Sequence, residues 1–322
     1  MPLRTVSTEG RPPPALDAPR SGGVVQGRRR FTARRGLTIL GFLAPAMIFV
    51  AVFTYYPMMS GGQMAFRNWN LNDLRNTDWI GFGNFATILA DSQFWTSLSN
   101  SVWWVIGSLV PQLAIGFALA LWLRRRFFLR GLYQSLVFFP WAVSGFLIGI
   151  LFRWMFNAEF GVVNDLLEKT HLITTPIPWL AEPKTAMISV IIANVWYGVT
   201  FFAIMILAAL QSVPEELYES AAMDGAGKVR SLFSVTLPYI RTTLALTVLL
   251  RVIWIFNFPD IIYGMTRGGP GGSTQIVTTY MITKTQEGNY GTASAVGLFV
   301  VFILIVFAAF YLMATRERKE PK

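Results

Sequence analysis

Long apolar segments alternate with polar stretches along this chain. The apolar segments lie at residues 37–60, 101–123, 132–156, 186–211, 241–264 and 292–314. A hydrocarbon core about 30 Å thick takes roughly 20 apolar residues in helical form, so each segment is long enough to cross a membrane. The pattern therefore predicts an all-α integral membrane protein with six transmembrane helices, in one domain at residues 37–315.

The polar stretch at residues 212–238, between the fourth and fifth segments, has the pattern of a helical hairpin. Ser212 and Glu215 have the spacing of a capping box, in which each side chain bonds a free backbone N–H. Pro214 suits a first helical turn, where its missing N–H costs no hydrogen bond. The pattern predicts that a short helix begins here.

Gly225 and Gly227 can end this short helix, because glycine accepts the left-handed conformation common after a helix. Beyond them, apolar positions recur at helical spacing up to Leu237 and Pro238. We therefore expect a second, amphipathic helix before the fifth apolar segment. Both helices are too polar to cross a membrane.

Lysine and arginine are unequally divided among the loops. Cytoplasmic loops of membrane proteins carry an excess of these residues. Most of the 27 basic residues fall in the two tails, in the loop at 124–131 and in the hairpin with the adjoining Arg241. Both termini and the hairpin are therefore predicted to be cytoplasmic, and the loops at 61–100 and 157–185 to lie outside.

The tails are predicted at residues 1–36 and 316–322. The first is rich in Pro, Gly and Arg and has no apolar periodicity, which is typical of a disordered segment. Arg34 and Arg35 before an apolar run could also belong to a twin-arginine export signal. The run that follows has full transmembrane length, which favours an uncleaved first helix.

Composition supports the membrane class. The 322 residues are 53% hydrophobic and 14% charged, with a mean hydropathy of +0.48, whereas about 25% of residues in a soluble domain are charged. The absence of cysteine excludes a disulfide framework and a thiolate metal site, and a single histidine excludes a multi-histidine site. The net charge of +10 could suggest nucleic acid, but the basic residues flank apolar segments instead of following one soluble face.

A glycine-rich stretch in the hairpin matches a phosphate-binding loop only partly. Such a loop requires G-x-x-x-x-G-K-[ST] after a strand, so that backbone amides surround the phosphates. Here Ala222 stands at the first glycine and Val229 at the final hydroxyl residue, and no strand is predicted before them. We therefore expect no cofactor on this chain and no ATPase site, and do not expect it to be an enzyme.

The segment from Leu217 to Ala226, followed by Leu237 and Pro238, resembles the E-A-A, D-G-A and L-P signature of permease subunits in binding-protein-dependent ABC importers. Ser220 stands where that signature usually has its first alanine. Three further stretches resemble the branch of this family that contains the maltose and glycerol phosphate permeases. They are Trp79–Phe85 with Phe94, Trp95 and Asn100; Asn194–Gly198; and Thr266–Thr274.

The resemblance implies a type I ABC importer permease fold in which 212–238 is a cytoplasmic coupling hairpin. In that family the short helix enters a cleft on a separate ATPase. The implied roles are a charged ATPase contact for Glu219, close approach for Ala221 and a turn at Gly225. The other coupling residues are Asp224, Leu237 and Pro238. Without the motif, Glu219 and Ala221 would be ordinary residues of a solvated helix.

The resemblance also implies the partners of such a permease. They are a second permease subunit, with a heterodimer expected, two ATPase subunits that carry ATP and Mg, an extracytoplasmic substrate-binding protein, membrane lipid and a carbohydrate substrate. The expected location is the cytoplasmic membrane of a bacterium or archaeon. No nucleic acid partner is expected.

Polar and aromatic residues in the fourth and fifth segments are candidates for the substrate path, because amides and carboxylates bond sugar hydroxyls and aromatic faces stack on sugar rings. Ordinary packing would also explain the aromatic residues, and the sugar could instead bind mainly to the partner permease. Gly198 lies one helical turn from Asn194 and leaves room for a ligand. The candidates are Asn194, Trp196, Tyr197, Gly198, Asn257, Asp260 and Tyr263.

Arg251 lies near the centre of the fifth segment, where an unpaired charge costs at least about 3 kcal/mol. It must face the protein interior, a cavity or a partner. It could line the path, or it could bond backbone carbonyls or an acidic residue of a neighbouring subunit. Both interpretations stay open.

Gly268, Gly269 and Pro270 in the last outer loop suit a flexible element that reaches toward a substrate-binding protein. Turn formation alone would also explain them. Two other function classes compete with the importer: a passive channel and an integral membrane glycosyltransferase. The second would need carboxylates or a metal site grouped at one membrane face, and no such cluster is visible in the sequence.

Overall fold

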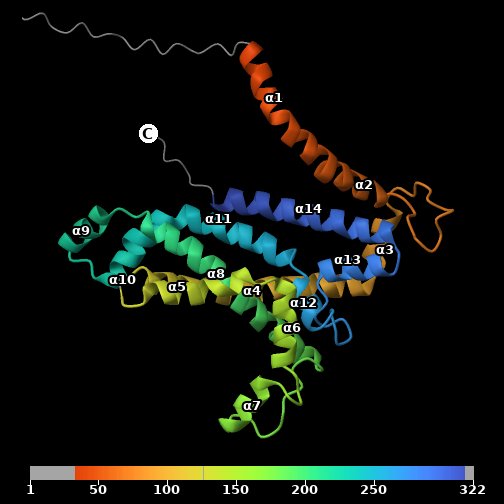
Figure 1. Ribbon diagram of the computed structural model, residues 1–322. Helices are drawn as coiled ribbons and strands as arrows, with labels where there is room; N and C mark the ends of the chain where they lie inside the picture. Colours follow the sequence, from red (N-terminus) through yellow and green to blue (C-terminus); the bar gives the residue numbers. More distant parts are fainter. Residues whose placement is uncertain (1–32, 126, 316–322) are drawn as a thin grey trace, which may run out of the picture. The chain divides into compact units, whose positions relative to one another are not determined.

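The computed structural model describes residues 33–125 and 127–315 (Figure 1). In these ranges the regular structure is helical apart from two isolated β-bridges, Arg67–Trp79 and Asn70–Asn289. The predicted all-α class is confirmed. The chain divides into two compact units, residues 1–56 and 57–322, and each is described by itself.

The first unit contains α1 (Ala33–Val50) and the π-helical turn η1 (Ala51–Tyr55). The predicted tail at 1–36 extends too far, because the helix already includes residues 33–36. The rest of that tail and all of the tail at 316–322 lie outside the described residues.

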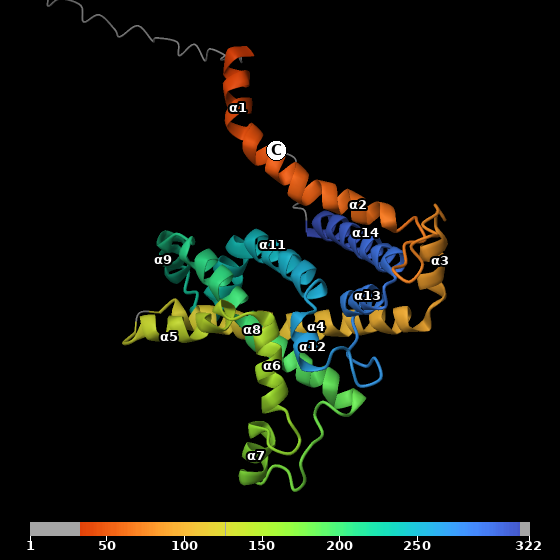
Figure 2. The same cartoon turned by 45° about the vertical axis from the view of Figure 1, so that its right-hand side comes forward.

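The second unit is a bundle of long apolar helices with shorter helices at its ends. α4 packs along α8, α11 crosses α4, and α13 packs on α14 (Figures 1 and 2). The long helices are α4 (Ser92–Leu123), α8 (Pro183–Gln211), α11 (Leu237–Phe256) and α14 (Tyr290–Thr315). The shorter ones are α2 (Tyr56–Met64), α3 (Gly83–Ala90), α5 (Arg130–Phe138), η2 (Phe139–Ala142), α6 (Gly145–Met155), α7 (Val162–Lys169), α9 (Glu215–Met223), α10 (Lys228–Ser231), η3 (Leu232–Thr236), α12 (Asp260–Met265) and α13 (Val277–Gln286).

Five helical stretches in the described part of the chain are long and apolar enough to cross a membrane. They are Leu40–Met64, Ser92–Leu123, Pro183–Gln211, Lys228–Met265 and Tyr290–Thr315. The bent pair α5 and α6 brings the number to six if it counts as one span. The helices overlap the six predicted segments, with α4 starting nine residues earlier than the segment at 101–123.

The segment at 132–156 is broken, which corrects the prediction of one straight helix. α5 and α6 meet at 99° (Figure 2). Pro140 lies in the 3-10 turn η2 between them, and Val143 has an extended backbone. Proline has no N–H to donate and its ring clashes with the carbonyl four residues earlier, so an α-helix cannot continue unbent through this position.

The predicted second helix of the hairpin is not separate. α10, the π-helical η3 and α11 form one run into the fifth span. Pro238 lies in the first turn of α11, directly after η3. Because proline cannot donate the usual helical hydrogen bond, a local change from α to π geometry before it lets the helix continue.

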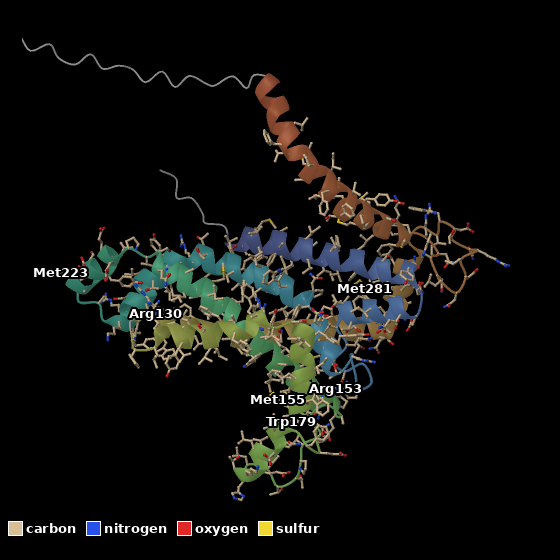
Figure 3. All side chains as sticks on the ribbon, viewed as in Figure 1. Arg130, Arg153, Met155, Trp179, Met223 and Met281 are labelled. Carbon is tan, nitrogen blue, oxygen red and sulfur yellow. The ribbon has the colours of Figure 1, made fainter. Side chains whose placement is uncertain are left out.

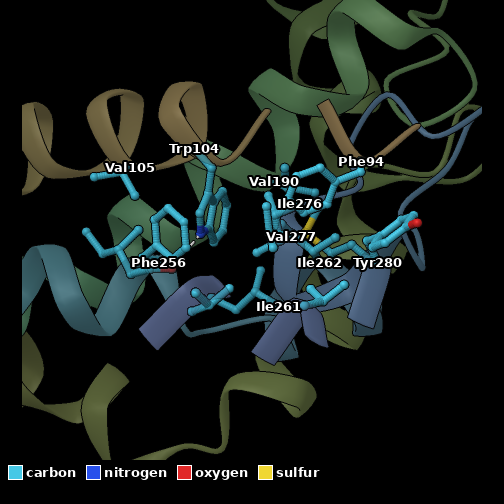
Figure 4. Close-up of a cluster of buried hydrophobic side chains, with 14 of the residues drawn as sticks. Phe94, Trp104, Val105, Val190, Phe256, Ile261, Ile262, Ile276, Val277 and Tyr280 are labelled. Atoms are coloured by element: carbon cyan, nitrogen blue, oxygen red, sulfur yellow. Dashed lines mark hydrogen bonds between the residues drawn. The ribbon is translucent and has the colours of Figure 1, made fainter. Parts of the chain in front are cut away.

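The core of the bundle is apolar and aromatic (Figure 4). Trp104 of α4 is fully buried, and its Nε1 donates a hydrogen bond to the carbonyl of Ile255 at 2.9 Å. The same carbonyl, near the end of α11, also accepts from the backbone N of Phe258 at 3.3 Å. Other members of this cluster are Phe94, Val190, Ile261, Ile262, Ile276, Val277 and Tyr280.

Candidate functional site

α9 lies at one end of the second unit, and most of its surface is exposed. Glu219 and Asp224 are exposed, and Ala221 is partly buried. Met223, labelled in Figure 3, has 89% of its surface accessible. Leu217 is also exposed. A short helix with acidic and apolar residues both exposed offers a surface for a protein partner.

The two ends of α9 are formed differently from one another. Pro214 is its N-cap residue, with no side-chain cap, and Ser212 still belongs to the end of α8, where its Oγ donates to the carbonyl of Ala209 at 2.8 Å. The predicted capping box is therefore wrong, because Ser212 lies two residues before the N-cap position and Glu215 is the first residue of the helix. Gly225 has a φ of +75° and ends the helix, as predicted.

Tyr218 attaches α9 to the rest of the bundle. Arg124, at the end of α4, donates from Nη1 to the hydroxyl of Tyr218 at 2.8 Å, and its guanidinium lies 4.6 Å from the ring centroid. The same hydroxyl is 2.9 Å from Oγ1 of Thr236 in η3 and shares a hydrogen bond with it. α9 is thus connected to two spans at once. From the sequence, Arg124 was only one of the basic residues that predict the orientation of the chain in the membrane.

A cavity of about 310 Å³ lies among α8, α11 and the α5–α6 bend. Three predicted path residues line it, namely Tyr197, Arg251 and Asn257. The ring of Tyr197 is stacked on that of Phe258, with centroids 5.4 Å apart and planes at 6°. The sequence interpretation missed the other lining residues, which are Trp141, Trp254, Ile255 and Phe258.

A buried polar cluster adjoins this cavity. Arg251 Nε donates to Oε1 of Gln112 at 2.7 Å, and Nε2 of Gln112 donates to the carbonyl of Asn194 at 2.9 Å. Gly198 packs directly against Arg251 and Gln112. A lone glutamine in a long apolar segment was the signal that could have identified Gln112, since a buried amide needs partners.

Arg251 thus bonds the side chain of Gln112, whereas the sequence suggested backbone carbonyls or an acidic residue of a neighbouring subunit as its partners. Among the described residues, no carboxylate forms an ion pair with Arg251, and its Nη2 has no hydrogen-bond partner. The side-chain amide of Asn194, fully buried, also has none in the described part. A polar ligand in the cavity could form the hydrogen bonds that Nη2 of Arg251 and the side-chain amide of Asn194 lack.

Five of the eight predicted path residues do not line the cavity: Asn194 and Gly198 belong to the adjoining polar cluster, and the other three lie elsewhere. Trp196 is 39% exposed and packs on Phe152 instead, at 5.7 Å between centroids. Asp260 is exposed in the first turn of α12. Tyr263 accepts a hydrogen bond from Nε2 of Gln286 at 2.6 Å.

The loop with Gly268, Gly269 and Pro270 is held by hydrogen bonds, in contrast to the flexible element suggested by its glycines. Oγ1 of Thr274 donates to the carbonyl of Gly269 at 2.7 Å. Asn100 of α4 donates from Nδ2 to the carbonyls of Gly272 and Gln275 at 3.1 and 3.0 Å. This loop is a structured turn attached to α4.

The same end of the bundle contains a charged contact between α4 and α13. Asp91 accepts from the hydroxyl of Tyr280 at 2.6 Å and from the backbone N of Gln93 at 2.8 Å. Burial by itself would raise the pKa of Asp91, but these two bonds and the nearby Lys284 outweigh it and lower the pKa. The pKa of Tyr280 is raised by burial and by its bond to Asp91.

The described residues contain no group of three or more His, Cys, Asp or Glu side chains that could hold a metal ion.

Residues 112–319 match the protein family described as binding-protein-dependent transport system inner membrane component. Curated relatives align over most of their length. The sulfoquinovosyl glycerol transport system permease protein of Agrobacterium fabrum is 32% identical over 85% of this chain and 90% of its own. The diacetylchitobiose uptake system permease protein of Streptomyces coelicolor is 32% identical over 99% of both chains.

A solved structure shares the fold. A chain in the crystal structure of a bacterial ABC transporter involved in the import of the acidic polysaccharide alginate superposes with a TM-score of 0.78 at 27% identity, covering 89% of this chain and 98% of the other. The family match covers more than half of the sequence and includes α8, α9 and α11. This chain therefore belongs to the inner membrane components of binding-protein-dependent transport systems, as a permease subunit.

Proposed function

We propose that this chain forms half of the translocation path of an ATP-driven carbohydrate importer and that α9 couples it to a separate ATPase. The observation that carries the proposal is the exposed α9 with its anchor at Tyr218, which connects it to α4 and η3. A partner that moves α9 would move these two elements with it. Glu219 would supply the charged contact and the exposed Met223 an apolar one.

The carbohydrate class is supported by the relatives and by the chemistry of the cavity. The names of relatives specify sulfoquinovosyl glycerol, diacetylchitobiose and, for a Thermococcus litoralis permease that is 30% identical, trehalose and maltose. Tyr197 and Trp254 offer aromatic faces, and Asn257 and Arg251 offer donors for hydroxyl groups. Pockets for small ligands combine apolar walls with a few polar groups in this way.

The assembly we propose has a second, distinct permease subunit, two ATPase subunits that hold ATP and Mg, and an external substrate-binding protein. A second solved structure supports the last partner. It shows the bacterial alginate ABC transporter in complex with an alginate pentasaccharide-bound periplasmic protein, and one of its chains has a TM-score of 0.76 to this chain at 27% identity. The structured turn at Gly268, Gly269 and Pro270 is the proposed docking element on this chain.

The test of the coupling role is Glu219→Ala, assayed in vesicles that hold the whole complex. We expect ATP-driven sugar uptake to fall at least tenfold, because the charged contact to the ATPase is lost while α9 keeps its anchor. Glu216→Ala, on the same exposed helix, is the matched control and should keep most of its uptake. Normal uptake by the Glu219 variant would contradict the coupling role, and uptake without ATP would indicate a passive channel.

A further inference from the structure

A second cavity, of about 590 Å³, lies between the end of α4, α9 and the α10–η3 segment. Three cationic side chains line it: Arg124, Arg125 and Lys228. Apolar side chains, among them Leu121 and Val229, line the same cavity. Among the described residues, no acidic side chain contributes to its lining.

The three cations differ in how they are bonded. Arg124 is held by Tyr218, so it shapes the wall of the cavity. Arg125 and Lys228 are exposed and form no ion pair with any described residue. Two free positive charges that share one cavity repel each other, and an anion between them would remove this repulsion.

The cavity lies at the end of an apolar span, where we expect the membrane to change from hydrocarbon to headgroups. α4 ends at Leu123, immediately before the two arginines. Trp122 lies beside this end and stacks on Phe127, with centroids 4.7 Å apart, while Tyr133 meets its edge at 5.2 Å. Aromatic groups of this kind gather at the membrane interface.

We propose that this cavity binds the headgroup of an anionic phospholipid of the cytoplasmic leaflet. Arg125 and Lys228 contact the phosphate, and Leu121 and Val229 contact the upper part of the acyl chains. Basic pockets between helices on the cytoplasmic side bind such headgroups. An amphiphile satisfies both the charged and the apolar lining, whereas a carboxylate of a soluble partner satisfies only the charges.

The lipid would also act on coupling. Its headgroup lies against the same wall that anchors α9, because Arg124 and Tyr218 both line this cavity. A bound anion would hold the end of α4, α9 and α10 together. The inference rests on the proposed cytoplasmic position of α9 and predicts that coupling depends on anionic lipid.

The test compares the whole complex in nanodiscs of phosphatidylcholine alone and with added phosphatidylglycerol. Lipid retention is measured by native mass spectrometry and coupling by ATP hydrolysis stimulated by the binding protein. The double variant R125Q/K228Q should retain phosphatidylglycerol roughly tenfold to thirtyfold less, as expected when two basic residues each contribute about 1 kcal/mol. Its ATP hydrolysis should no longer respond to the lipid.

R230Q is the matched control, since Arg230 is exposed on the same short helix but does not line the cavity. Equal retention by R125Q/K228Q and R230Q would overturn the proposal. Loss of the ATPase subunit from R125Q/K228Q in both lipids would also overturn it and would assign the cavity to an acidic partner. If Glu219→Ala retains phosphatidylglycerol normally but loses ATP-driven uptake, the lipid site is separate from the ATPase contact. If Glu219→Ala keeps normal uptake, the coupling role of Glu219 fails, but the lipid retention expected of the cavity does not change.

Discussion

Arg251 shows how an apolar helix carries a charge. The residue is buried, with 3% of its surface accessible, and it donates to Gln112 from the facing helix. The missing side chain at Gly198 leaves the space in which this contact forms, because a Cβ there would overlap Arg251 and Gln112. One glycine therefore permits a buried charge to be hydrogen-bonded.

Gly198→Ala is expected to destabilise the protein by about 1–3 kcal/mol, the usual cost of an extra group in a packed core. The added methyl group must displace the guanidinium of Arg251 or the amide of Gln112. Thermal unfolding of the purified complex measures this change. Gly297→Ala is the control, since its Cβ would lie 3.4 Å from Sδ of Met281, an ordinary contact; equal melting temperatures for the two variants would contradict the packing role.

Helices α6 and α12 pack at unusually short distance through glycine. A Cβ on Gly149 would lie 2.6 Å from the carbonyl oxygen of Ile261 and 3.0 Å from Cα of Gly264. Small residues let helix backbones approach closely where lipid supplies no hydrophobic driving force. This contact holds the bent α6 against the segment that follows the cavity-lining Phe258.

Gly149→Val should therefore push α6 away from α12 and lower stability by about 1–3 kcal/mol. It should also weaken sugar uptake, because the α5–α6 bend carries Trp141 into the cavity. Gly131→Val on α5 has no atom within 4 Å of its Cβ and should change little. Uptake and melting temperature are measured for both variants, and a similar loss in the two would exclude the close-packing explanation.

The arrangement of the whole molecule in the membrane follows from the charge asymmetry. The sequence predicts that α9 and α10 lie in the cytoplasm and that α7 lies outside. Because the chain has no cysteine, a single introduced cysteine is the one site on this chain that a maleimide can label.

Thr170→Cys, at the end of α7, should react with a membrane-impermeant maleimide in intact cells, and Gly227→Cys, before α10, should not. Both positions are exposed. After the membrane is permeabilised, both should react. Labelling of Gly227→Cys in intact cells would reverse the predicted orientation and remove the basis of the lipid site.

Membership of the fold class and the place of α9 were predictable from the sequence because they depend on local properties. Transmembrane length follows from the thickness of the bilayer, and the end of α9 follows from the positive φ that Gly225 accepts. The signature around Glu219 is contiguous, so it is recognisable without any knowledge of packing.

The composition of the cavity was not predictable in the same way. Gln112 and Arg251 are 139 residues apart, and nothing local relates them. Whether Tyr197 or its neighbour Trp196 faces the cavity depends on how α8 is rotated about its axis, since successive helical residues point about 100° apart. That rotation is determined by packing against α4 and α11. The apolar sequence therefore determines that these helices lie in a membrane, and contacts between distant helices determine which polar side chains meet inside it.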